Sequence, residues 1–332
     1  MKIVVTGASG FLGSWLVHRL LKEDADISIL ARATSDLTEL GDVKYRRVLG
    51  DVTNPESLKN SFKDADYVFH LAGLIAYRKA DRAAMEKVNV EGTKNVIDAV
   101  QACGVKRLLH VSSVVAVGAG FKPTQILNEN SPFNLSHLNL GYFETKRQAE
   151  ELVVNAVKNS QIDAVIVNPS TAYGAGDAKK GSRKTQLKVA RGKFKVYPSG
   201  GVNIVAVEDV VDGMVAALKK GRSGERYILS NENLYLKQVF DIIAEEAGVE
   251  PPKIKIPDVV IHSLGQIGDA MGSLGLPSSL SRENAWAATL FHWFDNTKAK
   301  NELGLTFLPA RTALKRSVQW MKENGLLDEA VK

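Results

Sequence analysis

The stretch VVTGASGFLGSWL, residues 4–16, decides the fold. An apolar run ends in three spaced glycines, and apolar residues at helical spacing follow them. Gly7 permits a tight turn, Gly10 lets main chain approach a pyrophosphate, and Gly13 allows a helix to pack closely on a sheet. The N-terminus of that helix offers unpaired N–H groups and a partial positive charge to phosphates. We therefore predict a dinucleotide-binding strand–turn–helix unit, the alternative being a purely structural glycine turn.

Strands and helices alternate after this unit. The expected strands are KIVVT (2–6), DISILAR (26–32), VKYRRVLGD (43–51), DYVFHLAG (66–73), VKRLLHVSSVVAVG (105–118), DAVIVNPSTAYG (163–174), NIVAVEDVV (203–211) and GERYILS (224–230). A short helix is expected over residues 55–62, and a long one over residues 83–104 that ends at Gly104. This alternation predicts an α/β fold of the Rossmann type, with a doubly wound parallel sheet and helices on both faces.

The pattern of strands and helices becomes less regular after Gly176, which lies within the polar, basic loop GAGDAKKGSRK (174–184). We expect residues 1–175 to form the cofactor-binding Rossmann domain. Residues 176–332 should form a smaller C-terminal α/β region that mainly binds substrate, with some elements returning to the Rossmann sheet.

Composition narrows the function classes. The 332 residues include 43 Lys and Arg against 37 Asp and Glu, scattered rather than clustered, so we expect no nucleic-acid partner. Cys103 is the only cysteine, which excludes an intrachain disulfide, and we expect no metal site. No apolar run approaches the ~18 residues that a membrane span needs. Because the chain opens directly on a strand, we expect a cytoplasmic protein.

The end of the second expected strand, ILARATSDL (29–37), bears on the choice of cofactor. Sites for NAD usually carry Asp or Glu about 20 residues after the glycines, to bind the ribose 2′-OH. Arg32 stands there instead, and a guanidinium can pair with a 2′-phosphate, assisted by Thr34 and Ser35. We therefore expect NADP, with NADPH preferred over NADH. A solvated surface arginine is the alternative, and nearby Asp36 keeps NAD open.

A tyrosine and a lysine lie one helical turn apart in NLGYFETKRQAEELV, residues 139–153. Tyr142 and Lys146 share a helix face, and an ammonium near a phenol favours the phenolate and lowers the phenol's pKa. The strand ending in Ser112 and Ser113 places hydroxyls at the carboxyl edge of the sheet, where open α/β folds bind ligands. These groups predict acid–base chemistry on a carbonyl, against the alternative of a solvated helix face.

Seven motifs occur in an order that resembles the extended short-chain dehydrogenase/reductase superfamily: TGASGFLG (6–13), DV (51–52), HLAG (70–73), NVEGT (89–93), VSS (111–113), YFETK (142–146) and NPSTAYG (168–174). Further stretches resemble its dihydroflavonol-4-reductase-like branch within the NAD-dependent epimerase/dehydratase family: ARATSDLTEL (31–40), VNIVAVEDVVDG (202–213) and GERYILSNENL (224–234). That branch includes bacterial members described as hopanoid-associated sugar epimerases.

The resemblance implies a catalytic triad of Ser113, Tyr142 and Lys146. It implies that the three glycines of the turn bind pyrophosphate, that Asp51 and Val52 flank the adenine, and that Asn168 approaches the nicotinamide. The full set of implied cofactor residues is Thr6, Gly7, Ser9, Gly10, Phe11, Leu12, Gly13, Arg32, Asp51, Val52, Leu71, Ala72, Gly73, Asn89, Ser112, Asn168, Pro169 and Ser170.

The leading hypothesis is an NADPH-dependent reductase of a ketone or aldehyde. Aromatic residues over 286–294 favour an apolar or aromatic substrate, and Leu74, Ile75, Tyr77 and Tyr173 are expected near it or in plain packing.

One alternative is a sugar-nucleotide epimerase or dehydratase, and a second is a redox sensor that binds NADP(H) without catalysis. Val114 and Val115 follow Ser113 where 4,6-dehydratases usually carry Asp and Glu, but Arg183 or Lys184 could still clamp a diphosphate. The resemblance is compatible with a monomer or a homodimer.

Overall fold

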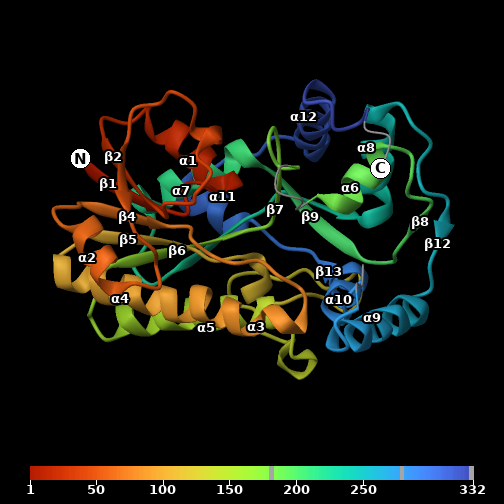
Figure 1. Ribbon diagram of the computed structural model, residues 1–332, viewed down its shortest axis with the longest axis horizontal. Coiled ribbons are helices and arrows are strands. Elements are labelled where there is room, and N and C mark those ends of the chain that lie inside the picture. Colours follow the sequence, from red (N-terminus) through yellow and green to blue (C-terminus); the bar gives the residue numbers. More distant parts are fainter. Residues whose placement is uncertain (179–182, 277–279, 329–332) are drawn as a thin grey trace.

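The computed structural model describes residues 1–178, 183–276 and 280–328. Two parts lie side by side, one around a seven-stranded sheet and a smaller one around four further strands (Figure 1). Of the basic loop expected over residues 174–184, residues 179–182 lie outside the described part of the chain.

The main sheet is parallel throughout. Its strands are β1 (Lys2–Thr6), β2 (Asp26–Ala31), β3 (Arg46–Leu49), β4 (Tyr67–His70), β5 (Arg107–Val111), β6 (Ala164–Pro169) and β10 (Arg226–Leu229). They lie in the order β10-β6-β5-β4-β1-β2-β3. The chain adds β2 and β3 on one side of β1 and the later strands on the other side, so the strand order reverses between β1 and β4. Ligands of open α/β sheets bind at the carboxyl ends of the strands beside such a reversal. The predicted doubly wound sheet is confirmed.

Helices cover both faces of this sheet (Figure 1). One face carries α1 (Phe11–Leu20), α7 (Val207–Lys220) and α11 (Thr297–Leu303), and the other carries α2 (Pro55–Phe62), α4 (Gly92–Cys103) and α5 (Gly141–Lys158). Successive residues of β1 point to opposite faces, so that Ile3 and Val5 join the first core and Val4 the second. A strand buried on both sides is therefore continuously apolar.

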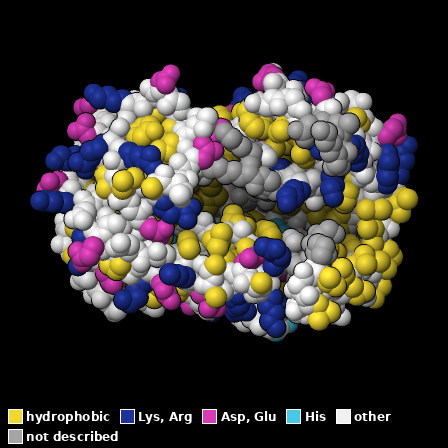
Figure 2. Space-filling model, in the orientation of Figure 1, with side chains coloured by type: hydrophobic (Ala, Val, Ile, Leu, Met, Phe, Trp, Pro, Cys, Tyr) yellow, Lys and Arg dark blue, Asp and Glu magenta, His cyan; other side chains and the backbone are white. Residues whose placement is uncertain are grey.

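The smaller part is built on β9 (Gly201–Ala206), which pairs with β7 (Thr171–Tyr173), β11 (Glu232–Tyr235) and β13 (Phe291–His292). Three helices share its core: α6 (Lys184–Ala190), α8 (Leu236–Ala247) and α12 (Ala310–Glu323). The remaining elements are α9 (Asp258–Ser273), α10 (Arg282–Thr289), and the short parallel pair β8 (Val196–Tyr197) and β12 (Ile254–Lys255). In Figure 2 the surface is hollowed between the two parts.

Several expected elements have different bounds. The long helix expected over 83–104 is interrupted, because α3 (Arg82–Met85) passes into a π-helical segment, η3 (Glu86–Glu91), before α4 begins. The strand expected over 105–118 ends at Val111, and residues 114–116 form a 3₁₀ turn, η4. The strand expected over 163–174 divides at Ser170, and β7 leaves the main sheet for the smaller one. The strand expected over 203–211 ends at Ala206, where α7 begins.

Candidate active site

The glycine turn between β1 and α1 forms a narrow backbone cradle. Gly7 has a φ of +75°, and a Cβ on Gly7 would lie only 2.6 Å from the Ala72 nitrogen. A Cβ on Gly13 would lie 2.7 Å from Ala8 Cα. No side chain caps α1 at Gly10, and its first turn has no acidic residue. The free helix N-terminus and the bare backbone fit the pyrophosphate of a dinucleotide.

The other residues expected around this cradle follow the carboxyl ends of β1 and β4. Thr6 ends β1, and its Oγ1 accepts a 3.3 Å hydrogen bond from the Ala72 nitrogen beyond β4. The Leu71 nitrogen donates to Thr6 O at 3.1 Å, which extends the pairing of the two strands. The remaining expected residues of these two segments are Ser9, Phe11, Leu12 and Gly73.

The end of β2 carries positive charge on the surface. Arg32 is exposed, and its main-chain nitrogen donates to Ser35 Oγ at 3.1 Å. Arg47 Nη2 donates to Arg32 O at 2.6 Å. Asp36 Oδ1 accepts from the nitrogen and the hydroxyl of Thr38, which holds this carboxylate on the following 3₁₀ turn, residues 38–40. The end of β2 thus carries two exposed arginines, Arg32 and Arg47, where an NAD site usually has a carboxylate.

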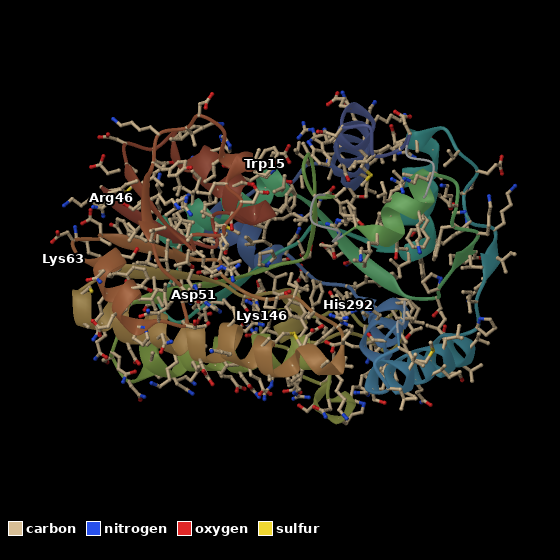
Figure 3. All side chains as sticks on the ribbon, in the orientation of Figure 1. Trp15, Arg46, Asp51, Lys63, Lys146 and His292 are labelled. Atoms are coloured by element: carbon tan, nitrogen blue, oxygen red, sulfur yellow. The ribbon has the colours of Figure 1, made fainter. Side chains whose placement is uncertain are left out.

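Asp51 and Val52 lie beyond the end of β3. Asp51 Oδ1 accepts hydrogen bonds from the nitrogen and the hydroxyl of Thr53, both at 2.9 Å. Val52 is buried, and a Cβ on Gly92, the first residue of α4, would lie 2.9 Å from Val52 Cγ2. In the view of Figure 3, Asp51 lies on the side of the first part and His292 on the side of the second, with Lys146 between them.

Helix α5 brings Tyr142 and Lys146 to the carboxyl edge of the sheet. Both side chains are buried, with 8% and 7% of their surface exposed. Lys146 Nζ donates a 2.9 Å hydrogen bond to the main-chain oxygen of Val111, the last residue of β5. The Ser113 side chain lies close enough to the Tyr142 phenol to lower the pKa of that phenol. The structure therefore brings Ser113, Tyr142 and Lys146 together.

The two serines after β5 have different surroundings. Ser113 begins the 3₁₀ turn η4 and its Oγ accepts a long hydrogen bond, 3.4 Å, from the Val115 nitrogen. Ser112 is buried, and its hydroxyl has no hydrogen-bond partner in the described part of the chain. Of the two, Ser113 is the serine that reaches Tyr142.

Burial governs the acidity of the tyrosine. It raises the pKa of Tyr142 above its usual value; Tyr77 and Glu283 act in the same direction, and the interaction with the Ser113 side chain acts against them. The sequence predicted the opposite shift. In the protein by itself the pKa shift is upward because loss of hydration disfavours the phenolate, whereas the prediction counted on the Lys146 ammonium together with the positive charge of an oxidised nicotinamide.

The lysine is affected by the same loss of water. Burial lowers the pKa of Lys146 to about 8, and the nearby Glu150 carboxylate acts in the opposite direction. Glu150 is itself buried, and it accepts from Arg226 Nη1 at 3.0 Å and from Asn168 Nδ2 at 2.7 Å. The Asn168 amide also donates to Ser113 O at 3.0 Å. Asn168 therefore holds the main chain at Ser113 in place.

Asn89 connects the π-helical segment η3 with helix α5. Its amide exchanges two hydrogen bonds with the Leu74 main chain, at 2.7 and 2.9 Å, and donates to Thr145 Oγ1 at 3.1 Å. Thr145 Oγ1 in turn donates to Tyr142 O at 3.1 Å. π-Helical turns are rare and are found frequently at functional sites, where they redirect a side chain.

A second buried chain of polar groups runs from the glycine turn to the same segment. Thr93 donates to Asn89 O, so His70 Nε2 must donate to Thr93 Oγ1, and His70 Nδ1 accepts from Thr6 Oγ1 at 2.8 Å. Burial lowers the pKa of His70 to about 3, which keeps the ring neutral. His110 lies beside it, with neither ring nitrogen hydrogen-bonded in the described part of the chain.

The segment after β6 ties the two parts of the molecule together. Pro169 ends β6 and is buried, and Ser170 Oγ donates to Asn203 Oδ1 on β9 at 2.7 Å. Trp15 on α1 donates from its indole nitrogen to Ala175 O at 3.1 Å (Figure 3). These bonds hold the strand that leaves the main sheet against the helix of the glycine turn.

Two groups from outside the expected triad adjoin Tyr142. The Tyr77 ring lies edge-on to it, with centroids 6.0 Å apart, and burial raises the pKa of Tyr77 to about 12. Glu283, on α10, accepts hydrogen bonds from the main-chain nitrogens of Gly141 and Tyr142. The sequence placed Tyr77 among residues near the substrate but gave no signal for Glu283, which is 141 positions away from Tyr142.

Arg183 and Lys184, the two residues that could bind a diphosphate, have different surroundings. Arg183 lies over the Tyr173 ring, 3.9 Å from its centroid, and Arg183 Nε is 3.5 Å from Asp177 Oδ2. Arg183 Nη2 also donates to the main-chain oxygen of Ala172. Lys184 begins α6 and is exposed. Arg183 therefore serves in packing the smaller part.

Within residues 1–178, 183–276 and 280–328, no group of three or more His, Cys, Asp or Glu side chains is arranged to hold a metal ion. None of the helices described there is long and apolar enough to cross a membrane.

Comparison with known proteins identifies the family. Residues 3–230 match the model of the NAD dependent epimerase/dehydratase family. The chain belongs to this family. It is accordingly a member of the extended short-chain dehydrogenase/reductase superfamily and an NAD(P)-dependent oxidoreductase, which confirms the resemblance predicted from the motifs.

Individual relatives of this family member match along nearly the whole chain. "Sterol demethylase protein B" of Methylococcus capsulatus is 28% identical over 98% of this chain and 100% of its own. A Synechocystis protein with a provisional name as a dihydroflavonol 4-reductase is 30% identical over 97% and 94%. A Stigmatella aurantiaca ketoreductase of a 4-farnesyl-3,4-dihydroquinoline-1-oxide is 27% identical over 92% and 91%. The crystal structure of gox2253 superimposes with a TM-score of 0.87 and 31% identity, over 98% and 99%.

Proposed function

We propose that this protein is an NADPH-dependent reductase of a ketone or aldehyde. One observation carries the proposal: the buried phenol of Tyr142 is within reach of the Ser113 side chain, and Lys146 lies one turn along the same helix. Two hydroxyls that can both reach a carbonyl oxygen, with the Lys146 ammonium nearby, suit protonation of that oxygen during reduction.

The chain's own groups have separate tasks in this reaction. The nicotinamide, when bound, supplies the hydride that adds to the carbonyl carbon. Ser113 donates a hydrogen bond to the carbonyl oxygen, and Tyr142 gives its phenolic proton to that oxygen as the alcohol forms. Lys146, charged below about pH 8, stabilises the phenolate that is left. Because Asn168 bonds the Ser113 main chain, the two hydroxyls keep their relative position.

The preference for NADPH is supported by the charges at the end of β2. Arg32 and Arg47 are both exposed there, and Asp36 is bonded to Thr38 on the turn that follows. A 2′-phosphate can form charge-assisted hydrogen bonds with a guanidinium, whereas the NAD ribose has only a hydroxyl to offer.

An apolar substrate is supported by the surroundings of Tyr142 and by the names of relatives. Leu74, Val115 and Trp286 pack in one hydrophobic cluster with Tyr142. The names of the relatives include a sterol, a dihydroflavonol and a farnesylated dihydroquinoline. In this proposal residues 1–175 bind the cofactor, and residues 176–332 mainly bind the substrate.

The epimerase/dehydratase alternative is less well supported. Val114 and Val115 occupy the turn after Ser113 and have no proton to exchange, and Arg183 is committed to Tyr173 and Asp177. A non-catalytic redox sensor would have no need of a buried serine–tyrosine pair with a lysine.

The test is a screen of NADPH oxidation over aldehydes, ketones, flavanonols and keto-steroids, run in parallel with NADH. One NADP⁺ released for each alcohol formed supports the reductase. Conversion of a nucleotide sugar with no net oxidation of the cofactor supports the alternative, and tight NADPH binding with no turnover supports the sensor.

A further inference from the structure

Glu283 caps the catalytic helix from the other part of the molecule. It lies in the first turn of α10 and only 8% of its surface is exposed. Its Oε2 accepts a 3.0 Å hydrogen bond from the Gly141 nitrogen, and its Oε1 accepts a 2.9 Å hydrogen bond from the Tyr142 nitrogen. The first N–H groups of a helix have no partner within the helix, so one carboxylate satisfies two of them.

Helix α5 has no local substitute for this carboxylate. The residue at its N-cap position is Leu140, which has no side-chain acceptor, whereas α2 is capped by the adjacent Asn54. The neighbour of Glu283, Arg282, donates to Leu138 O at 2.8 Å and to Asn139 O at 3.2 Å. The start of α10 therefore holds both the loop that enters α5 and the first turn of α5.

The same carboxylate places a negative charge beside the phenol. Its effect adds to that of Tyr77, and it raises the pKa of both tyrosines. Burial raises the pKa of Glu283 itself, and the hydrogen bonds from the Tyr142 and Gly141 nitrogens act against that rise, as do Arg282 on its own helix and Arg82 on α3. A helix N-terminus by itself carries a partial positive charge that would favour the phenolate of Tyr142, and the Glu283 carboxylate offsets that charge.

We propose that Glu283 is a positioning residue for Tyr142. From the smaller part of the molecule it fixes the first turn of α5, and its negative charge adds to the effect of burial in favouring the protonated phenol. The inference rests on the proposed function only in the role of Tyr142 as proton donor; the capping of α5 stands independently.

The first test measures hydrogen exchange of the peptide segment 139–146 in the full-length protein without substrate. We expect Glu283→Ala to speed exchange about fivefold or more, because two N–H groups lose their acceptor. Glu283→Gln, which keeps one oxygen, should give a smaller increase. Glu144→Gln is the matched control: Glu144 lies in the first turn of α5, is also 8% exposed, and is paired with Arg147.

The second test separates positioning from mere stability. With NADP⁺ and the alcohol product, oxidation requires the phenolate, so kcat falls on acidification through the apparent pKa of Tyr142. In Glu283→Gln the pH at which kcat falls should be lower than in the parent, since a negative charge near Tyr142 has been removed. Glu144→Gln should leave this pH unchanged.

The inference is overturned if exchange of segment 139–146 in folded Glu283→Ala and Glu283→Gln matches that of the parent. It is also overturned if exchange quickens but kcat of folded Glu283→Gln falls at the same pH as that of the parent, because the carboxylate would then be a structural cap only. If instead the parent turns over no carbonyl compound, or Tyr142→Phe is as active as the parent, the proposed function fails while the exchange result still decides whether Glu283 caps α5.

Discussion

Lys146 Nζ lies 2.9 Å from the main-chain oxygen of Val111 and donates a hydrogen bond to it. The ammonium is thereby held at the end of β5, one residue before the two serines, rather than in solvent. Burial at this place lowers the pKa of Lys146 to about 8. The charge of the lysine is therefore sensitive to pH in the range where the enzyme is expected to work.

This placement predicts a loss of activity in mild alkali. The folded protein gives up the Lys146 proton as pH rises through about 8, whereas an unfolded lysine keeps its proton to about 10.4. We expect kcat/KM for NADPH to fall as pH rises past about 8, because this parameter reports groups of the free enzyme. Lys146→Met should be much less active and should lack this pH dependence. A parent profile that stays level to about pH 10 would contradict the assignment.

The charge at the end of β2 predicts the effect of removing Arg32. Arg32→Ala should weaken NADPH binding about tenfold or more, because a charge-assisted hydrogen bond to the 2′-phosphate is lost, and should change NADH binding little. Arg46→Ala is the matched control, since Arg46 is an exposed arginine on neighbouring β3 that donates to Ser28 Oγ (Figure 3). Fluorescence titration with both cofactors measures this, and equal losses for NADPH and NADH would exclude a 2′-phosphate site at Arg32.

The packing of the glycine turn predicts opposite outcomes for two glycines. Gly13→Ala should destabilise the protein by about 1–3 kcal/mol, since its Cβ would lie 2.7 Å from Ala8 Cα, and should weaken cofactor binding. Gly272→Ala, on α9, meets no atom within 4 Å and should be neutral or stabilising by up to about 1 kcal/mol. Urea unfolding compares the two, and equal stabilities would show that the turn tolerates a side chain.

The ion pair of buried Glu150 with half-buried Arg226 predicts a loss of stability when the arginine is removed. Arg226→Ala should destabilise the protein by about 1–3 kcal/mol, because the buried Glu150 carboxylate loses a charged hydrogen-bond donor. Lys94→Ala breaks the exposed pair of Lys94 with Asp98 and should cost less than about 1 kcal/mol. Chemical denaturation of both variants distinguishes the pairs. A small loss in Arg226→Ala would mean that Glu150 finds other partners or takes up a proton.

Local signals in the sequence predicted much of the main sheet and the shared helix face of Tyr142 and Lys146. Strand β1 and helix α2 have the predicted bounds, because a continuous apolar run and an Asn–Pro helix start are local signals. Gly104 ends α4 with a φ of +64°, as expected of a helix stop. Tyr142 and Lys146 share a helix face for the same local reason.

The features that the sequence did not reveal depend on contacts between distant segments. The π-helical segment around Asn89 interrupts a pattern that looks like one regular helix, and its amide pairs with Leu74. The raised pKa of Tyr142 follows from burial, with smaller contributions from Tyr77 and Glu283, and no spacing rule connects Glu283 with Tyr142. Strand β7 belongs to the smaller sheet because it pairs with β9. That strand begins 30 residues after β7 starts (Thr171 and Gly201), so no local signal indicates the pairing.

The measurement that tests the account most directly compares Tyr142→Phe with the parent, using the best carbonyl substrate from the screen. The phenylalanine ring keeps the packing against Tyr77 but has no proton to give. We predict unchanged NADPH binding by fluorescence titration and a fall in kcat of about 100-fold or more, the usual contribution of a positioned general acid. A variant that reduces the substrate at the parent's rate would show that the proton comes from elsewhere and would contradict the role of Tyr142.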